Sequence, residues 1–174
     1  MALPRPTPTA HERVLAEEDF IVSKTDLKGT ITYGNRIFID ISGYSEFELL
    51  GAPHNILRHP DMPQAVFKLL WDAIQAGREI NAYVKNLAKD GSFYWVFANI
   101  TPSFDEAGRM TGYYSVRRKP RGSGIRAAAG LYQALLRAEQ QAGSGQNGMR
   151  ASMDLLNRTL QEKGMGYDEF VLGL

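Results

Sequence analysis

The sequence predicts an α+β fold in which a five-stranded antiparallel sheet has short helices on one side and is followed by C-terminal helices. Three observations support this fold class. A hairpin of two short strands comes first, a series of short helices and one longer helix comes next, and three strands joined by tight turns complete the sheet. Alternating apolar residues mark the strands, whereas apolar residues at helical spacing mark the longer helix.

The hairpin is predicted from two short β-rich segments on either side of a turn. Ile21–Asp26 and Thr30–Tyr33 have strand composition, and Asp26-Leu27-Lys28-Gly29 between them has the residues that turns require. These two strands are expected to pair antiparallel.

The helical region follows the hairpin. Asn35–Ile41 predicts a short helical segment that ends at Gly43. Ser45 and Glu48 are spaced as a capping box for a second short helix that Gly51 closes. A longer helix is expected over Met62–Ala76, with Gly77 at its end, because one face carries the apolar residues Val66, Phe67, Leu69, Leu70, Trp71 and Ile74.

Three further strands are predicted, at Ile80–Leu87, Phe93–Ser103 and Met110–Arg118. The intervening segments 89–92 (Lys-Asp-Gly-Ser) and 105–108 (Asp-Glu-Ala-Gly) contain the aspartate and glycine of tight turns. Short turns of this kind predict an antiparallel meander.

The segment 53–63 carries two histidines, an arginine, an aspartate and three prolines. Prolines restrict the backbone at and before their own positions, so this segment has a preset shape. It is either the wall of a ligand site or a solvated connector in which Asp61 caps the helix that starts near Met62.

Motifs along residues 12–120 resemble the FAD-binding PAS domain of bacterial aerotaxis, or energy-taxis, receptors. The most specific is the string His54-Asn55-x-x-Arg58-His59-Pro60-Asp61-Met62-Pro63. The others are Thr25-Asp26-Leu27, Ile31-Thr32, Ile41-Ser42-Gly43-Tyr44, Gly51-x-Pro53, Val84-Lys85-Asn86, Lys89-Asp90-Gly91, Tyr94-Trp95-Val96 and Gly112-Tyr113-x-Ser115-Val116-Arg117.

The resemblance implies a cavity that holds FAD non-covalently and relays the redox state of the flavin to a signalling output. It implies that Arg58, His59 and Asp61 are needed for FAD binding. It also implies that the pocket is lined or supported by Asn35, Phe67, Asn86 and Tyr94. Physical chemistry agrees: Arg58 offers a planar fork for a pyrophosphate or a carbonyl, and Asn86 offers both a donor and an acceptor. Phe67 and Trp71 supply flat apolar surface for a ring system.

Several of these residues also have structural interpretations. Phe67 and Trp71, at i and i+4, would be core residues in an ordinary helix. Asn86 would be a plain strand residue that satisfies a neighbouring backbone group, and Tyr94 would be a cross-strand packing partner. His59 would orient the loop through a backbone hydrogen bond. We hypothesise that Asn86 responds to flavin reduction, because an amide can flip to exchange its acceptor for its donor.

One position departs from the pattern of the family. The strand after the longer helix opens with tryptophan in that pattern, whereas this chain has Ile80. The departure favours a rival function, in which a PAS fold serves as a dimerisation or adaptor module with another ligand or none. A haem-based gas sensor is a third possibility, since His54 and His59 lie in the PAS region.

Composition excludes several classes of function. The 174-residue chain has a net charge of +1, which argues against a nucleic-acid surface, and its dense basic run, 117–121, is expected to be a solvated linker. No stretch approaches the roughly 18 apolar residues of a membrane span. With no cysteine, flavin–cysteine adducts and thiol switching are impossible.

The expected organisation is an N-terminal cap segment over 1–19, a PAS sensor domain over 20–120 and a C-terminal helical extension over 121–174. Residues 121–124 (Arg-Gly-Ser-Gly) predict a flexible junction, and helical spacing resumes over Ile125–Ala142 and Met149–Lys163, with a break at 143–148. These helices are expected to pack on the sheet, to form a dimer interface or to dock a partner. No catalytic or metal motif is present, so we expect a non-enzymatic protein. From the resemblance we expect a cytoplasmic, homodimeric sensor that contacts a chemotaxis-type or other signalling protein.

Overall fold

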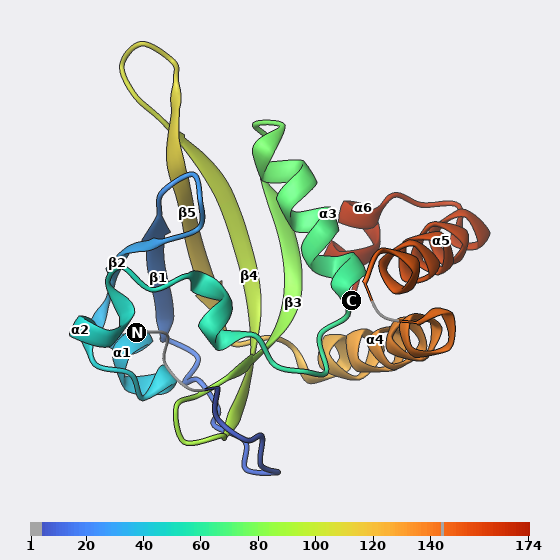
Figure 1. The fold of residues 1–174 in the computed structure, drawn as a ribbon, viewed down its shortest axis with the longest axis horizontal. Helices are drawn as coiled ribbons and strands as arrows, with labels where there is room; N and C mark the ends of the chain where they lie inside the picture. Colours follow the sequence, from blue (N-terminus) through green and yellow to red (C-terminus); the bar gives the residue numbers. More distant parts are fainter. Residues whose placement is uncertain (1–4, 144) are drawn as a thin grey trace.

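The computed structural model describes residues 5–143 and 145–174. Its centre is a five-stranded, fully antiparallel sheet with strand order β2-β1-β5-β4-β3. The strands are β1 (Phe20–Thr25), β2 (Ile31–Gly34), β3 (Ile80–Leu87), β4 (Phe93–Phe104) and β5 (Met110–Arg118). The predicted fold class is confirmed, and Figure 1 shows the sheet together with the helices around it.

The first helical group lies between β2 and β3 in the chain. It contains α1 (Arg36–Ser42), α2 (Glu46–Leu49), η1 (His54–Leu57) and α3 (Gln64–Gln75). The predicted caps are confirmed: Gly43 ends α1 in the left-handed conformation, and Ser45 and Glu48 form a reciprocal capping box for α2.

The start of α3 differs from the prediction. The helix begins at Gln64, and Pro63 at its N-cap has no side-chain hydrogen bond, so the interpretation of Asp61 as the cap is wrong. The cap comes from a distant segment instead. The buried Glu139 carboxylate accepts a 2.7 Å hydrogen bond from the backbone N–H of Gln64.

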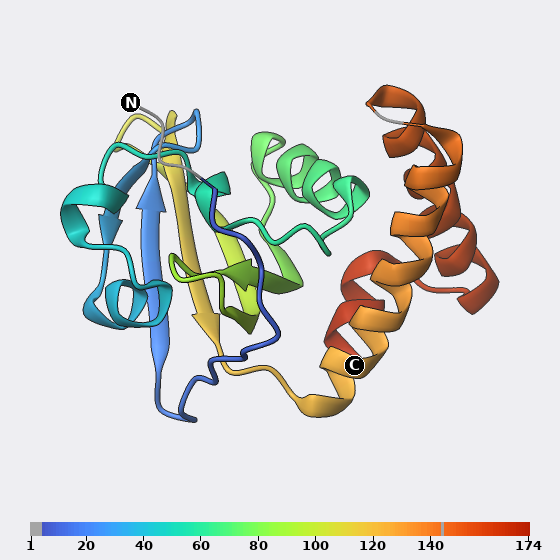
Figure 2. The ribbon, with the colours of Figure 1, turned by 60° about the horizontal axis from the view of Figure 1, so that its bottom comes forward.

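The second helical group is C-terminal and contains α4 (Gly122–Ala142), α5 (Gln146–Lys163) and α6 (Tyr167–Leu172). Helices α4 and α5 lie side by side in Figures 1 and 2, and α5 packs against α3 while α6 packs against β3. Of the three placements expected for these helices, the structure shows packing on the PAS sheet. The break predicted at 143–148 is shorter, because α5 begins at Gln146; Ser144 lies outside the described residues.

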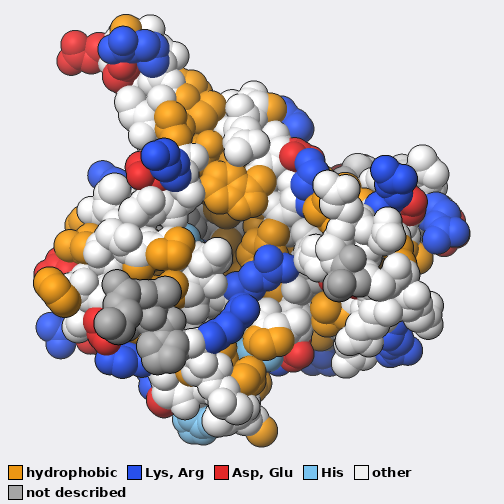
Figure 3. All heavy atoms as spheres, viewed as in Figure 1, with side chains coloured by type: hydrophobic (Ala, Val, Ile, Leu, Met, Phe, Trp, Pro, Cys, Tyr) orange, Lys and Arg blue, Asp and Glu red, His pale blue; other side chains and the backbone are white. Residues whose placement is uncertain are grey.

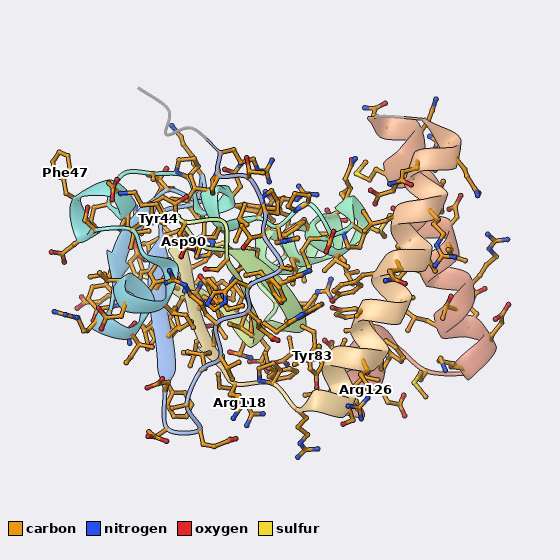
Figure 4. All side chains as sticks on the ribbon, turned by 90° about the horizontal axis from the view of Figure 1, so that it is seen from below. Tyr44, Phe47, Tyr83, Asp90, Arg118 and Arg126 are labelled. Carbon is orange, nitrogen blue, oxygen red and sulfur yellow. The ribbon has the colours of Figure 1, made fainter. Side chains whose placement is uncertain are left out.

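The flexible junction predicted at 121–124 is wrong, because α4 already begins at Gly122. Its glycines permit close packing: a Cβ atom at Gly124 would lie 2.1 Å from the Tyr83 hydroxyl oxygen. Tyr132 fixes the same helix by donating a 2.6 Å hydrogen bond to the Tyr83 carbonyl, and its ring stacks on Trp95. In Figure 4, Tyr83 lies between the sheet and the first turns of α4.

The N-terminal segment runs along the start of β4. Backbone hydrogen bonds join Thr9 to Gly91 and both His11 and Arg13 to Phe93. The Arg13 guanidinium then donates to Ser92, to the Asp90 carboxylate and to the carbonyl of Ile41. These contacts hold the segment against the β3–β4 turn.

Candidate functional site

A cavity of about 200 Å³ lies between the inner face of the sheet, η1 and α3. Side chains alternate along a strand, so every second residue of β1, β3, β4 and β5 faces it. Its principal sheet residues are Ser23, Thr25, Val84, Asn86, Ala98, Ile100, Tyr113, Ser115 and Arg117. The helical side and the loops contribute Lys28, Gly29, Pro53, His54, Asn55, Arg58, Phe67, Leu70, Trp71 and Ile74.

The helical wall of the cavity is apolar because α3 presents one face to it. Phe67, Leu70, Trp71 and Ile74 recur at the spacing of a single helical face. The Trp71 ring meets the Tyr113 ring edge-on, with centroids 5.7 Å apart. This wall provides aromatic surface that can contact a flat ring system.

Arg58 and Asn86 lie together at the cavity. Arg58 follows η1 as its C-cap, and its backbone forms an antiparallel bridge with Asn86 of β3. The Arg58 guanidinium lies 4.2 Å from the centre of the Phe67 ring, and burial lowers its pKa from the ordinary arginine value. Asn86 is buried, and its side chain lines the cavity. Both side chains are therefore available to a ligand.

Lys and Arg side chains gather in a band across the middle of the face that carries η1 (Figure 3). Lys28 and Arg58 line the cavity, and Arg5 donates a 2.7 Å hydrogen bond to the Arg58 carbonyl. The positive charge makes this side of the cavity suitable for an anionic group.

His59 and Asp61 shape the loop beside the cavity and do not line it. The buried His59 accepts a 3.0 Å hydrogen bond at Nδ1 from the Asp61 backbone N–H, and burial lowers the His59 pKa. The Asp61 carboxylate is 60% exposed and pairs at 2.6 Å with the Lys85 ammonium on β3. These contacts fix the loop between η1 and α3.

Asn35 and Tyr94 also lie outside the cavity lining. Asn35 caps α1 by accepting from the Phe38 N–H, and it joins β1 by accepting from Val22 and donating to Phe20. Tyr94 is buried below the cavity, and its hydroxyl has no hydrogen-bond partner in the described ranges. Of the predicted site residues, the cavity therefore brings together Arg58, Phe67, Trp71 and Asn86.

A polar cluster at the β1–β5 end of the cavity was not predicted as a ligand site. Ser23 accepts a hydrogen bond from Nη2 of Arg117, and the His54 Nε2 atom lies 3.2 Å from the same hydroxyl. His54 belongs to the quoted string, but Arg117 belongs to the basic run interpreted as a solvated linker. That interpretation is wrong for Arg117, which is only 2% exposed. The signal was its strand parity with Tyr113 and Ser115.

Burial and mutual repulsion set the charges of this cluster. Burial lowers the pKa of Arg117 to about 10, so the guanidinium is charged at neutral pH. Burial and the positive charge of Arg117 lower the pKa of His54 to about 3, so the imidazole is neutral there. Within residues 5–143 and 145–174, no group of three or more carboxylate or imidazole side chains is arranged to hold a metal ion.

Sequence comparison identifies the class of protein to which this domain belongs. Residues 31–117 match the family described as PAS fold, which is half of the chain. The chain belongs to the PAS family and contains a PAS sensor domain.

The particular relatives are signalling proteins. The chain is 42% identical over 130 residues to the aerotaxis receptor of Escherichia coli (strain K12), which covers 75% of this chain and 26% of that receptor. It is 28% identical over 102 residues to the biofilm dispersion protein BdlA of Pseudomonas aeruginosa, covering 58% of this chain and 23% of that protein. The chain thus matches about a quarter of the length of each relative.

Solved structures show the same fold. A PAS domain of a protein from Colwellia psychrerythraea has a TM-score of 0.53 and 25% identity, over 58% of this chain and 86% of that one. The light-state LOV domain of the blue-light photoreceptor Aureochrome1 has a TM-score of 0.57 at 22% identity, over 66% and 91% of the two chains. None of the described helices is both long enough and apolar enough to span a membrane.

Proposed function

We propose that this protein is a cytoplasmic redox or oxygen sensor that binds FAD non-covalently and relays the flavin redox state to a signalling partner. The observation that carries the proposal is the cavity that brings together Arg58, Asn86, Phe67 and Trp71. The sequence similarity of the chain to a protein named for aerotaxis supports the same function. We propose further that it acts as a homodimer and contacts a chemotaxis-type or other signalling protein.

The size and charge of the cavity fit the ring system of FAD inside it and the diphosphate outside it. Pockets that enclose whole small-molecule ligands occupy roughly 300–1,000 Å³. A cavity of about 200 Å³ is therefore matched to a ring system, not to a dinucleotide. The anionic diphosphate would extend to the side where Arg58 and Lys28 lie. Guanidinium groups bind phosphate oxygens through paired hydrogen bonds.

The residues around the cavity have distinct roles in this proposal. Phe67 and Trp71 exclude water and contact the faces and edges of the ring. Asn86, on the edge strand β3, donates to or accepts from a ring edge. When bound, the flavin supplies reversible uptake of electrons, with a proton taken up at its reactive nitrogen.

The other predicted residues do not line the cavity but hold the segments around it in place. His59 and Asp61 would be needed for FAD binding because they fix the loop that presents Arg58. Asn35 would act by holding α1 against β1, and Tyr94 by supporting its cross-strand neighbour Asn86 from β4. Substituting them would loosen the site without removing a ligand contact.

The relay is proposed to run along β3. A flip of the Asn86 amide on reduction would alter its hydrogen bonds at the cavity face of this strand. Three residues earlier, the Tyr83 carbonyl accepts the hydrogen bond from Tyr132 of α4. Strand β3 therefore joins the cavity to the C-terminal helices, which we propose as the output surface.

The rival function is an adaptor with another ligand or none. The departure at Ile80 slightly favours this function. Ile80 is buried opposite Ile100 and does not itself line the cavity, but it lies on the same face of β3 as Val84 and Asn86, so an indole at this position would point toward the cavity. A haem sensor would reveal itself by an intense near-ultraviolet band in place of the flavin bands.

Titration of the flavin-free full-length protein with FAD tests the proposed function. Arg58→Gln should weaken binding tenfold or more, because a hydrogen bond to a charged group is worth about 1.5–3 kcal/mol. Asn86→Leu should weaken binding at least fivefold, because a polar ring edge left without its partner costs about 1–3 kcal/mol. Arg36→Gln is the control, because Arg36 is exposed and forms an ion pair with Asp40 of its own helix. A folded wild-type protein that takes up no FAD would refute the function.

A further inference from the structure

Arg117 is a buried positive charge that faces the cavity without a carboxylate partner. It lies on β5, where Tyr113, Ser115 and Arg117 alternate toward the cavity, and it is 2% exposed. Its Nη2 donates to Ser23, whereas Nε and Nη1 have no hydrogen-bond partner in the described part of the chain.

The groups around Arg117 do not neutralise it. His54 from η1 and Tyr94 from β4 are both uncharged at neutral pH, because burial and the guanidinium lower the His54 pKa and burial raises the Tyr94 pKa. Ser23 from β1 is neutral as well. Phe38 from α1 offers its ring at 4.6 Å from the guanidinium carbon, but that contact uses none of the free N–H donors.

A charge buried in this way destabilises the folded protein unless something compensates it. A structural role would be served better by an apolar side chain of similar length. Arg117 lines the cavity in which the proposed function places a ring system, and two of its donors are without a partner in the described ranges. The missing partner is therefore expected to come with the ligand.

We propose that Arg117 is a ligand-binding residue that donates hydrogen bonds from Nε and Nη1 to acceptor atoms of the flavin ring and stabilises the negative charge of the reduced ring. This inference rests on the proposed function. Reduction adds two electrons from a donor, dithionite in the test, and one proton from solvent. One negative charge is left on the ring opposite Arg117, whereas a second proton would leave the ring neutral.

Arg117→Met tests the proposal, with Arg118→Met as the matched control. Arg118 is the next residue on the strand, but it is exposed, and it lies at the lower surface of the molecule in Figure 4. Arg117→Lys retains the charge and serves as the conservative variant. All three variants are made in the full chain. Arg117→Met and Arg118→Met therefore make the same substitution on opposite faces of one strand.

Three measurements are expected to separate the variants. The melting temperature of flavin-free Arg117→Met should exceed that of wild type by at least about 2 °C, because an unpaired charge has been removed. Its affinity for FAD should fall at least tenfold. The midpoint potential of wild type should fall with pH at the slope of a couple that takes up two electrons and one proton. This slope is half that of a couple that takes up two electrons and two protons, and Arg117→Met should approach the steeper value. Arg118→Met should match wild type, and Arg117→Lys should lie between.

Arg117→Met that melts lower than wild type when flavin-free, or that binds FAD with wild-type affinity, would overturn the inference and leave the proposed function standing. Wild-type protein that takes up no FAD would overturn both.

Discussion

Glu139 joins the C-terminal helices to the PAS domain, and its substitution tests how that contact is made. The carboxylate is 8% exposed and extends from α4. It accepts 2.7 Å and 2.8 Å hydrogen bonds from the Gln64 backbone N–H at the start of α3 and from the Ser152 hydroxyl on α5. One side chain therefore connects three helices, one of which follows the loop that carries Arg58.

The expected cost of Glu139→Gln follows from these contacts. A glutamine keeps the shape and can still accept, but the hydrogen bonds change from charge-assisted ones, worth about 1.5–3 kcal/mol, to neutral ones of about 0.5–1.5 kcal/mol. The favourable interaction with the α3 N-terminus, about 0.3–1 kcal/mol, is also lost. We expect a loss of about 2 kcal/mol in the free energy of unfolding. Glu139→Ala should cost more, because it also leaves the partly buried Gln64 N–H without its acceptor, whereas the Ser152 hydroxyl can still donate to the Met149 carbonyl.

Urea unfolding of the full chain, followed by circular dichroism, measures these costs. The control is Glu162→Gln, an exposed glutamate on α5, which should change the stability by less than about 0.5 kcal/mol. If Glu139→Gln matches this control, the carboxylate contributes no net stability, and the reasoning that it caps α3 would be refuted.

Two further predictions concern pH and the glycines of α4. The folded pKa of His54, about 3, lies below the ordinary value near 6.5, so the unfolded chain takes up the proton first and stability is lost as pH falls from about 6.5 toward 3. Between pH 7 and pH 5 the loss of stability amounts to about 1–2 kcal/mol. His54→Gln should abolish this pH dependence, and the control His11→Gln should retain it. Urea titrations that give the same pH slope for His54→Gln and wild type would contradict the prediction. Gly130→Ala should raise the melting temperature because a Cβ there meets no atom within 4 Å, whereas Gly124→Ala should lower it because the Tyr83 ring must move. The reverse order would show that helix propensity does not decide the outcome at Gly130.

Much of the fold was predictable because its signals are local. Turn residues fix where strands end: the Asp26 carboxylate accepts hydrogen bonds from the backbone of both Lys28 and Thr30, which closes the β1–β2 turn. The capping box of Ser45 and Glu48 likewise depends on residues three apart. Such signals predict the strands of the meander with their observed bounds to within a residue.

The errors arose where distant segments decide the outcome. The N-terminus of α3 takes its cap from Glu139, 75 residues away, so nothing near Asp61 could indicate it. Glycines at the start of α4 suggested a flexible linker. In the structure, a larger residue at Gly124 would collide with the Tyr83 ring, which occupies the space beside it.

The candidate site was predictable where a motif carried it, as at Arg58 and Asn86. Arg117 was missed because a basic run in a sequence indicates a solvated segment. The pairing of β5 with β1 and β4 places this residue on the inner face of the sheet. Strand parity, applied to charged as well as apolar residues, would have found it.

The most direct test of the central claim is the absorption spectrum of the full-length protein purified from cells, with the released chromophore identified after heat denaturation. The account predicts flavin absorption bands and close to one FAD released per chain. A colourless protein that also fails to take up added FAD would contradict it.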